Sequence, residues 1–404
     1  MEEPSMLRST GDRVVIVGGG IAGALLAKTL QNHADVVLID PENACVLLNL
    51  GGGTTDESRS MQWMDGCRKE YFEIPWANLR AKVDQFAVER AVIPHSDYLT
   101  NAWIVAASAT GVDDSVVLTS IGRAVAYDFL VIATGRTCIR PARRSERLEM
   151  FTQDKERIQR AKTVMIVGGG PIGVELAAEI VITYPDKRVT LVHGGPRLLT
   201  SVMSPKASTK ALEWLRYKKV TVLLDQTVDV SSAPPDAKEF TTSAGETVAA
   251  DCHFLCTGQP LASAWLLETF LAEHVNADGQ LAVDEHLRVG GRKNVFAVGD
   301  ITDVPEAKQG HLAQRQAMVV SRNLKLLVKG GAVKEEKLHR YKPGAKSGMT
   351  VMLGRYDALS ELPFMSLIGS LPGAVKPRDL FVSRTRRMMG LKSKPYNNMP
   401  RLNM

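Results

Sequence analysis

Residues 13–40 read RVVIVGGGIAGALLAKTLQNHADVVLID, and this stretch decides the fold. The run Val14–Val17 is continuously apolar, as expected of a parallel strand that is buried on both faces. Three glycines with the spacing G-x-G-x-x-G follow, and a helical pattern of alanine and leucine comes next. A second apolar run, Val36–Ile39, ends in Asp40, 22 residues after Gly18. The sequence therefore predicts a strand, a glycine turn, a helix and a second strand.

This order of elements is typical of a fold that binds a dinucleotide. The first glycine allows the tight turn, the second lets the backbone approach a pyrophosphate, and the third allows close packing of helix on strand. The helix N-terminus stabilises phosphate charge, and Asp40 can bind a ribose diol. The alternative is a glycine turn without a ligand. The predicted contacts in the turn are Gly18, Gly19, Gly20, Ile21, Ala22 and Gly23.

Residues 164–192 repeat the pattern as VMIVGGGPIGVELAAEIVITYPDKRVTLV. The three glycines with the same spacing are Gly168, Gly170 and Gly173. This second strand leads into His193 rather than into an acid. Without a carboxylate nothing repels a ribose 2′-phosphate, and Arg197 lies close by in sequence. We therefore expect these glycines and His193 to bind NADH and NADPH without strong selectivity.

Two dinucleotide folds in one chain imply two dinucleotides. A flavoprotein that takes hydride from NADH or NADPH onto FAD needs both sites. The alternative of two nicotinamide sites has no obvious chemical use. The sequence therefore predicts an α/β protein with two Rossmann-like units, one for FAD and one for NAD(P)H.

The length and composition agree with this prediction. At roughly 150 residues per domain, 404 residues indicate two or three domains. With 45% hydrophobic and 23% charged residues, disorder is excluded as the main state. No apolar run is long enough for a membrane span, and no secretory signal or lipidation motif is visible. We expect a cytoplasmic protein.

The charge distribution and the cysteine spacing limit the classes of partner and cofactor that we expect. Residues 376–404 hold eight Lys or Arg residues and one Asp, a net charge of +7, whereas the remaining chain carries −1. A broad nucleic-acid-binding surface is therefore not expected. The five cysteines form no C-x-x-C pair, so neither a redox dithiol nor a metal site is expected. Electrons must then leave the flavin directly.

Further segments carry a family resemblance. YDFLVIATG (127–135) and CHFLCTG (252–258) are apolar strands that end in Thr-Gly, and VFAVGD (295–300) ends in Gly-Asp. With these segments the chain resembles the pyridine nucleotide-disulfide oxidoreductase superfamily. Its apoptosis-inducing-factor-like branch, with the ferroptosis-suppressor-type quinone reductases and their plant homologues, is the most similar group. The segments that carry this likeness are KEYFEIPWANLRAKV, GGGPIGVELAAEI, DITDVPEAKQGHLAQ, YKPGA and VKPRDLFVS.

The resemblance implies FAD contacts outside the glycine turn. It implies that Arg80, Asp300 and Lys308 contact the cofactor and that the main chain of Val105 lies near the adenine. For Arg80 the alternative is an exposed helix residue, and for Lys308 it is a solvated loop charge. Near the reacting rings the resemblance implies Glu175 and Lys376 as catalytic residues. Their alternatives are an acid that favours the helix dipole and a member of the basic tail.

The resemblance also implies the domain order. The FAD domain is expected over residues 10–140 and 275–335, and the NAD(P)H domain over 155–270. A polar crossover at 140–150 joins them, and 234–247 is predicted to form a hairpin. Residues 341–404 are expected to form a small C-terminal region over the flavin, with a basic tail. Residues 42–68 interrupt the family pattern, and a surface insertion, a retained intron or an error in the gene model would each explain them.

Three hypotheses for the function remain, and they differ in what accepts electrons from the flavin. The first is an NAD(P)H:quinone oxidoreductase, for which Gln314 is a candidate beside the quinone, although outward-facing helix packing explains this residue equally. The second is a redox-switched binding protein like apoptosis-inducing factor, and the third is a monodehydroascorbate-type reductase. A membrane quinone would require peripheral contact with anionic membranes. For that contact the tail from Lys376 onward interleaves basic residues with Leu380, Phe381, Met388, Met389 and Leu391. The alternative is a solvated basic tail whose first part packs over the flavin.

Overall fold

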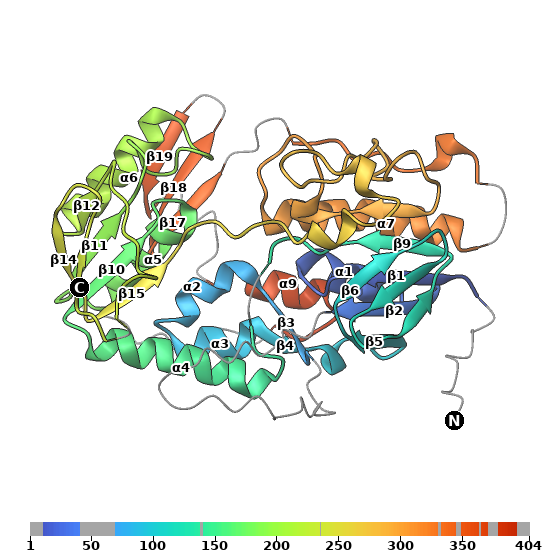
Figure 1. The fold of residues 1–404 in the computed structure, drawn as a ribbon, viewed down its shortest axis with the longest axis horizontal. Helices are drawn as coiled ribbons and strands as arrows, with labels where there is room; N and C mark the ends of the chain where they lie inside the picture. Colours follow the sequence, from blue (N-terminus) through green and yellow to red (C-terminus); the bar gives the residue numbers. More distant parts are fainter. Residues whose placement is uncertain are drawn as a thin grey trace.

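The computed structural model describes residues 11–40, 69–137, 140–234, 236–329, 333–344, 349–362, 365–370 and 379–393. Over these ranges the chain forms two parallel sheets, each with helices packed on it (Figure 1). The predicted α/β class with two Rossmann-like units is confirmed. The predicted insertion at 42–68 and the predicted catalytic Lys376 lie outside the described residues.

The first sheet has the strand order β16-β9-β1-β2-β5, and all of its pairs are parallel. Its strands are β1 (Arg13–Val17), β2 (Asp35–Asp40), β5 (Ala102–Ala106), β9 (Phe129–Ile132) and β16 (Val295–Ala297). The helices α1 (Ile21–Leu30) and α7 (Gly310–Leu327) pack together in one core with Val14 and Ile16. Val15 and Val17 face the opposite core, with β6 (Ala109–Val112), β7 (Val116–Thr119) and β8 (Ala124–Ala126). The continuous apolar run thus reflects burial on both faces.

The second sheet repeats this plan with the order β12-β11-β10-β15. Its parallel strands are β10 (Thr163–Val167), β11 (Arg188–Val192), β12 (Thr221–Leu223) and β15 (Cys252–Leu255). The helices α5 (Pro171–Thr183) and α6 (Pro205–Tyr217) share a core with Val164 and Ile166. Met165 and Val167 face the antiparallel hairpin of β13 (Glu239–Thr241) and β14 (Thr247–Ala249). A hairpin was expected in this stretch, and it extends two residues beyond the predicted range.

The connection between the units is more helical than its polar sequence indicates. The crossover expected at residues 140–150 continues into α4 (Arg144–Arg160), in which only Phe151 and Ile158 are buried. This helix packs against α3 (Gln85–Ala91), which follows α2 (Asn78–Ala81). The small antiparallel pair of β3 (Tyr71–Glu73) and β4 (Val92–Pro94) flanks these two helices in the chain. With so few apolar positions, α4 has little helical periodicity for a sequence pattern to show.

The C-terminal residues form a sheet that contributes to both cores. Its antiparallel strands are β17 (Thr350–Leu353), β18 (Asp357–Leu362) and β19 (Met365–Gly369). Val351, Leu353 and Leu359 belong to the core of the second unit, whereas Met352 and Ala358 belong to that of the first. Side chains of a strand alternate between its faces, so one sheet can contact both units. In Figure 1 this sheet stands beside α5 and α6.

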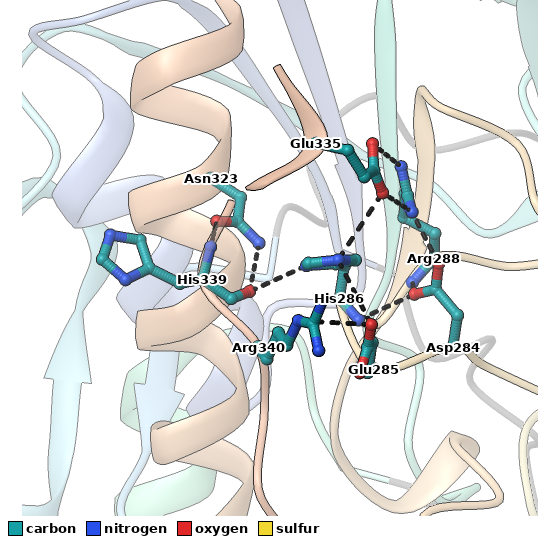
Figure 2. A network of polar contacts seen from close by, with 8 residues as sticks. All are labelled: Asp284, Glu285, His286, Arg288, Asn323, Glu335, His339 and Arg340. Atoms are coloured by element: carbon teal, nitrogen blue, oxygen red, sulfur yellow. Dashed lines mark hydrogen bonds and ion pairs between the residues drawn. The ribbon is translucent and has the colours of Figure 1, made fainter. Parts of the chain in front are cut away.

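A network of polar contacts holds the segment from Glu335 to His339, which precedes this sheet in the chain (Figure 2). The fully buried Asn323 donates to the carbonyl of His339 over 2.9 Å and accepts from its amide over 2.7 Å. Nδ1 of the buried His286 donates to the same carbonyl over 3.1 Å, and Arg288 pairs with Glu335. The residues from Glu335 to His339 are therefore held against the first unit on α7 and on the loop before β16.

Candidate functional site

The first glycine turn has the geometry that a dinucleotide requires. Gly18 has φ +107°, and a Cβ there would lie 2.5 Å from the carbonyl oxygen of Ala133. A Cβ on Gly23 would lie 1.8 Å from the carbonyl oxygen of Gly18, so the helix packs on the turn without room for a side chain. An added Cβ on Gly20 meets nothing within 4 Å. The three glycines therefore serve the turn, the helix contact and an open approach, as their spacing predicts.

Asp40, the last residue of β2, is hydrogen-bonded to this turn. Its Oδ1 accepts a hydrogen bond from Gly19 N over 3.0 Å, and its Oδ2 accepts one from Lys69 Nζ over 2.7 Å. His95 Nε2 lies 3.3 Å from the same Oδ2. Burial alone raises the pKa of Asp40, but Lys69 and His95 outweigh it and lower the pKa to about 2. Asp40 is therefore a carboxylate at neutral pH, as a ribose acceptor must be.

Lys69 and His95 contact Asp40, and the sequence did not reveal these two contacts. Burial raises the pKa of Tyr98, so its hydroxyl stays protonated and lies 2.6 Å from His95 Nδ1. The ionised Asp40 can only accept, so the contact at 3.3 Å requires the ring hydrogen of His95 to lie on Nε2. Lys69 follows the interruption at 42–68, and the lone His95 has no motif around it. Only the fold brings these side chains to the end of β2.

The second glycine turn has the same geometry as the first, but a histidine stands where the first has an aspartate. A Cβ on Gly173 would lie 1.8 Å from the Gly168 carbonyl oxygen, and one on Gly170 would meet nothing within 4 Å. Gly169 N donates to Nδ1 of His193 over 3.1 Å, the bond that Gly19 makes to Asp40 in the first turn. Since Nδ1 is the acceptor, the ring hydrogen of His193 lies on Nε2 and is available to a ligand oxygen. His193 therefore replaces the acid in structure and not only in sequence.

Arg197 belongs to the same loop system. Leu199 N donates to the Gly169 carbonyl over 2.9 Å, which places this segment beside the turn. One guanidinium nitrogen of Arg197, Nη1, is buried without a hydrogen-bond partner in the described part of the chain. A buried donor without a partner is costly, so a bound phosphate oxygen would stabilise it.

Two residues expected at the flavin lie close together in the first unit. Asp300 forms an ion pair with Arg136, Oδ2 to Nε 3.0 Å, and Arg136 directly follows the predicted Ala-Thr-Gly strand end. Lys308 donates to the carbonyls of Thr302 and Val304 over 2.6 and 3.1 Å. Burial is the main cause that lowers the pKa of Lys308. The sequence did not predict the pair of Arg136 with Asp300, although the place of Arg136 after the strand end was a usable signal.

The other expected site residues lie in three places. Val105 pairs with Ile39 in the sheet, one residue before the position opposite Asp40. Arg80 is buried, so the alternative of an exposed helix residue is wrong, and its guanidinium donates to Glu179 over 2.8 Å. Glu175 lies on the first turns of α5, and its Oε1 accepts from Met352 N over 2.8 Å. The contacts of these residues with a cofactor stay predictions.

Three orphaned polar atoms test whether FAD fits the first unit. Thr134 Oγ1, Trp76 Nε1 and Gln309 Nε2 are buried and have no hydrogen-bond partner among the described residues. Gln309 precedes α7, and a Cβ on Gly310 would lie 2.5 Å from the Trp76 ring, so two of these groups meet at that helix end. Buried polar atoms of this kind need partners from a ligand, and with the open approach at Gly20 the residues of the first unit fit FAD.

The two described cysteines do not form a redox pair of reactive thiolates. Burial raises the pKa of Cys252 to about 11 and that of Cys256 to about 12. Both thiols are therefore protonated at neutral pH and poor nucleophiles. Cys45, Cys67 and Cys138 lie outside the described residues.

Comparison with known proteins identifies the class. The family model for pyridine nucleotide-disulphide oxidoreductases matches residues 12–317, so the chain belongs to this family. It is 30% identical to ferroptosis suppressor protein 1 of Homo sapiens, covering 93% of this chain and 95% of that protein. It is 26% identical to apoptosis-inducing factor homolog B of Dictyostelium discoideum, covering 94% and 97%. The resemblance found in the sequence is confirmed.

Solved structures share the fold at low sequence identity. The sulfide:quinone oxidoreductase of Aquifex aeolicus matches with a TM-score of 0.66 at 17% identity, covering 95% of this chain and 93% of that one. NDH2 of Plasmodium falciparum, solved in complex with NADH, matches with 0.63 at 15% identity, covering 96% and 100%. With the family and its two dinucleotide sites, the chain is an FAD-dependent oxidoreductase that uses NADH or NADPH.

We predict that Gly20→Val yields folded but colourless protein. Its Cβ has free space in the structure, but the side chain would occupy the approach of the pyrophosphate. Gly170→Val is the matched variant in the second turn and should keep its flavin while losing reduction by NADH. Flavin absorbance of the purified variants measures both outcomes. Full flavin occupancy in Gly20→Val would show that the first turn does not hold FAD.

We predict that His193→Glu loses the use of NADPH and keeps that of NADH. A glutamate can still accept from Gly169 N, but its charge repels a 2′-phosphate, and we expect kcat/KM for NADPH to fall about 100-fold. His193→Asn keeps a neutral acceptor and should use both cofactors. Equal loss of both cofactors in His193→Glu, or strict NADH preference in the wild type, would contradict this reading.

Proposed function

We propose that this protein passes electrons from NADH or NADPH through FAD to a quinone-type acceptor. The observation that carries the proposal is a cavity of about 800 Å³ between the two units and the C-terminal sheet. Thr200–Ser204 come from the second unit, Asp303–Lys308 from the first, and Met349 and Leu362 from the C-terminal segments. The cavity therefore reaches Lys308, one of the expected FAD contacts.

The cavity has the size and the lining for a small planar acceptor. Its volume lies in the range of small-molecule sites, and its lining mixes apolar with polar and charged side chains. Apolar surface comes from Val202, Met203 and Leu362. The charged lining residues are Lys308 and three acids, Asp303, Glu306 and Glu361. Gln314 was the residue that the sequence suggested beside a quinone. It is buried, so the alternative that it faces outward from the helix is wrong. It is not among the described residues that line the cavity.

The residues of the chain supply position and charge. When bound, FAD accepts hydride from a nicotinamide and releases electrons singly or in pairs. The positive end of α7, which has no side-chain cap, lies next to Trp76 and the buried Gln309 amide. These donors and the half-buried Lys308 favour negative charge at this end of the site. His193 orients the second dinucleotide through Nε2.

Other observations agree with direct electron release. The two described thiols are protonated at neutral pH, so they do not offer a dithiol relay. One protein with this fold is by name a sulfide:quinone oxidoreductase. The quinone acceptor is therefore favoured over an acceptor that needs a protein disulfide.

The test of this proposal separates flavin reduction from reoxidation. Ser201 lines the cavity from an exposed position, and Ser201→Trp should raise KM for a short-chain quinone about 10-fold by filling it. The rate of flavin reduction by NADH in a single turnover should not change, and Ala244→Trp, far along the chain on an exposed turn, is the control. Slower reduction by NADH in Ser201→Trp would assign the cavity to the nicotinamide. Wild-type protein that stays reduced in the presence of quinone would favour a redox-switched binding protein.

We also propose that contact with membranes is electrostatic. The helix α9 (Val382–Met388) and its neighbours bury Leu380, Val382 and Met389 in the core of the first unit. Part of the apolar half of the expected interleaving is therefore used for packing in this core and is not available to a membrane. Arg386 is buried too, whereas Arg384, Arg387 and Lys392 are exposed. None of the described helices is long and apolar enough to cross a bilayer.

We predict that the protein sediments with anionic vesicles at low salt and not at high salt. Each exposed basic residue near an anionic surface contributes about 1 kcal/mol, and salt screens this attraction. Reversal of Arg384, Arg387 and Lys392 to glutamate should abolish sedimentation. Reversal of the exposed Arg123, Lys206 and Lys293 is the charge-matched control and should not. Equal loss in both triple variants would mean that net charge alone drives the contact.

A further inference from the structure

The free edge of β17 is bound by side chains from both dinucleotide units. Within the described residues β17 pairs only with β18, so its other edge presents backbone groups without a strand partner. Met352 N donates to Glu175 Oε1 over 2.8 Å, and Glu175 belongs to α5 of the second unit. Just past the strand, the Gly354 carbonyl accepts from Arg80 Nη2 over 3.2 Å, and Arg80 belongs to α2 of the first unit. Three separate parts of the chain therefore meet at this edge.

A buried ion pair closes the same junction. Both Nε and Nη2 of Arg80 donate to Glu179 Oε1, over 3.0 and 2.8 Å. The side chains are 2% and 3% exposed. The other oxygen of Glu179, Oε2, is buried without a hydrogen-bond partner in the described ranges, so this carboxylate depends on Arg80. Glu179 lies four residues after Glu175, which puts both acids on one face of α5.

Apolar contacts connect the same parts of the chain as the ion pair does. Val83, which follows α2, belongs to the core of the second unit, and Val351 and Leu353 of β17 belong to it as well. A Cβ on Gly354 would lie 2.7 Å from Ile182 Cγ1, so the turn after β17 packs directly on α5. Arg355 forms an ion pair with Asp84 over 3.0 Å, which ties that turn to the start of α3. Charged and apolar contacts thus hold the segment of α2 and α3, the helix α5 and the strand β17 together.

We infer that Arg80 and Glu179 are positioning residues that set the orientation of the two dinucleotide units through β17. Hydride transfer needs the nicotinamide stacked on the flavin, and these rings are held by different units. A misplacement of about 1 Å can slow such a step about 100-fold. The inference rests on the proposed use of both sites and gives Arg80 a role other than direct contact with FAD.

The test replaces the pair by apolar residues of similar volume. Arg80→Met combined with Glu179→Met leaves no unpaired buried charge, so the variant should fold. We expect flavin reduction by NADH, per bound flavin, to slow by about 10- to 100-fold. Reduction by dithionite, which needs no second unit, should stay at the wild-type rate. Amide exchange in peptides that contain Met352 should become faster, and this measurement does not depend on the cofactor.

The matched control is the Arg13–Asp35 pair, which is buried to a similar degree inside the first sheet. Arg13→Met combined with Asp35→Met should leave NADH reduction and Met352 exchange unchanged. Arg80→Lys keeps the charge but cannot make the same fork of bonds, and it serves if the double variant does not fold. Wild-type reduction and exchange in the Arg80 variants would overturn the inference. Failure of NADH to reduce the wild-type flavin would sink the proposed function instead, and Met352 exchange alone would then decide the inference.

Discussion

The structure depends on one steric constraint that occurs twice. In each dinucleotide unit a helix begins very close to the preceding glycine turn. A Cβ on the third glycine of the G-x-G-x-x-G motif would lie 1.8 Å from the carbonyl oxygen of the first. Only glycine allows that contact, for Gly23 and for Gly173 alike, and it points the helix N-terminus at the open side of the turn. Both turns are thereby open to a phosphate, because a Cβ on the second glycine of each motif would meet nothing within 4 Å.

The units differ in the group that closes the turn, and this difference suits two cofactors. In the first unit the acceptor of the loop amide is the carboxylate of Asp40, whose pKa is held low by Lys69 and His95. In the second unit it is the neutral Nδ1 of His193. A carboxylate binds a ribose diol and repels a 2′-phosphate, whereas an imidazole tolerates the phosphate. The same backbone bond therefore permits different selectivity at the two sites.

Local signals predicted the parts of this protein that local chemistry determines. The strands around both turns, the hairpin on the second unit and the Gly-Asp strand end follow from apolar periodicity and glycine spacing, and the structure contains all of them. The partners of Asp40 could not be predicted, since Lys69 and His95 reach it only through the folded chain. The polar helix α4 has too few apolar residues to show a period. The interleaved basic and apolar residues after Lys376 suggested a membrane contact, but Leu380 and Met389 among them belong to the core of the first unit.

The most direct test of the account is an anaerobic titration of the purified protein with NADH, followed by flavin absorbance. We expect a yellow protein that releases FAD on denaturation and is bleached by one equivalent of NADH per flavin. The same bleaching is expected with NADPH, because His193 carries no charge that excludes it. A colourless protein would contradict the first site. A yellow protein whose absorbance does not change with either nicotinamide would contradict the transfer between the two sites.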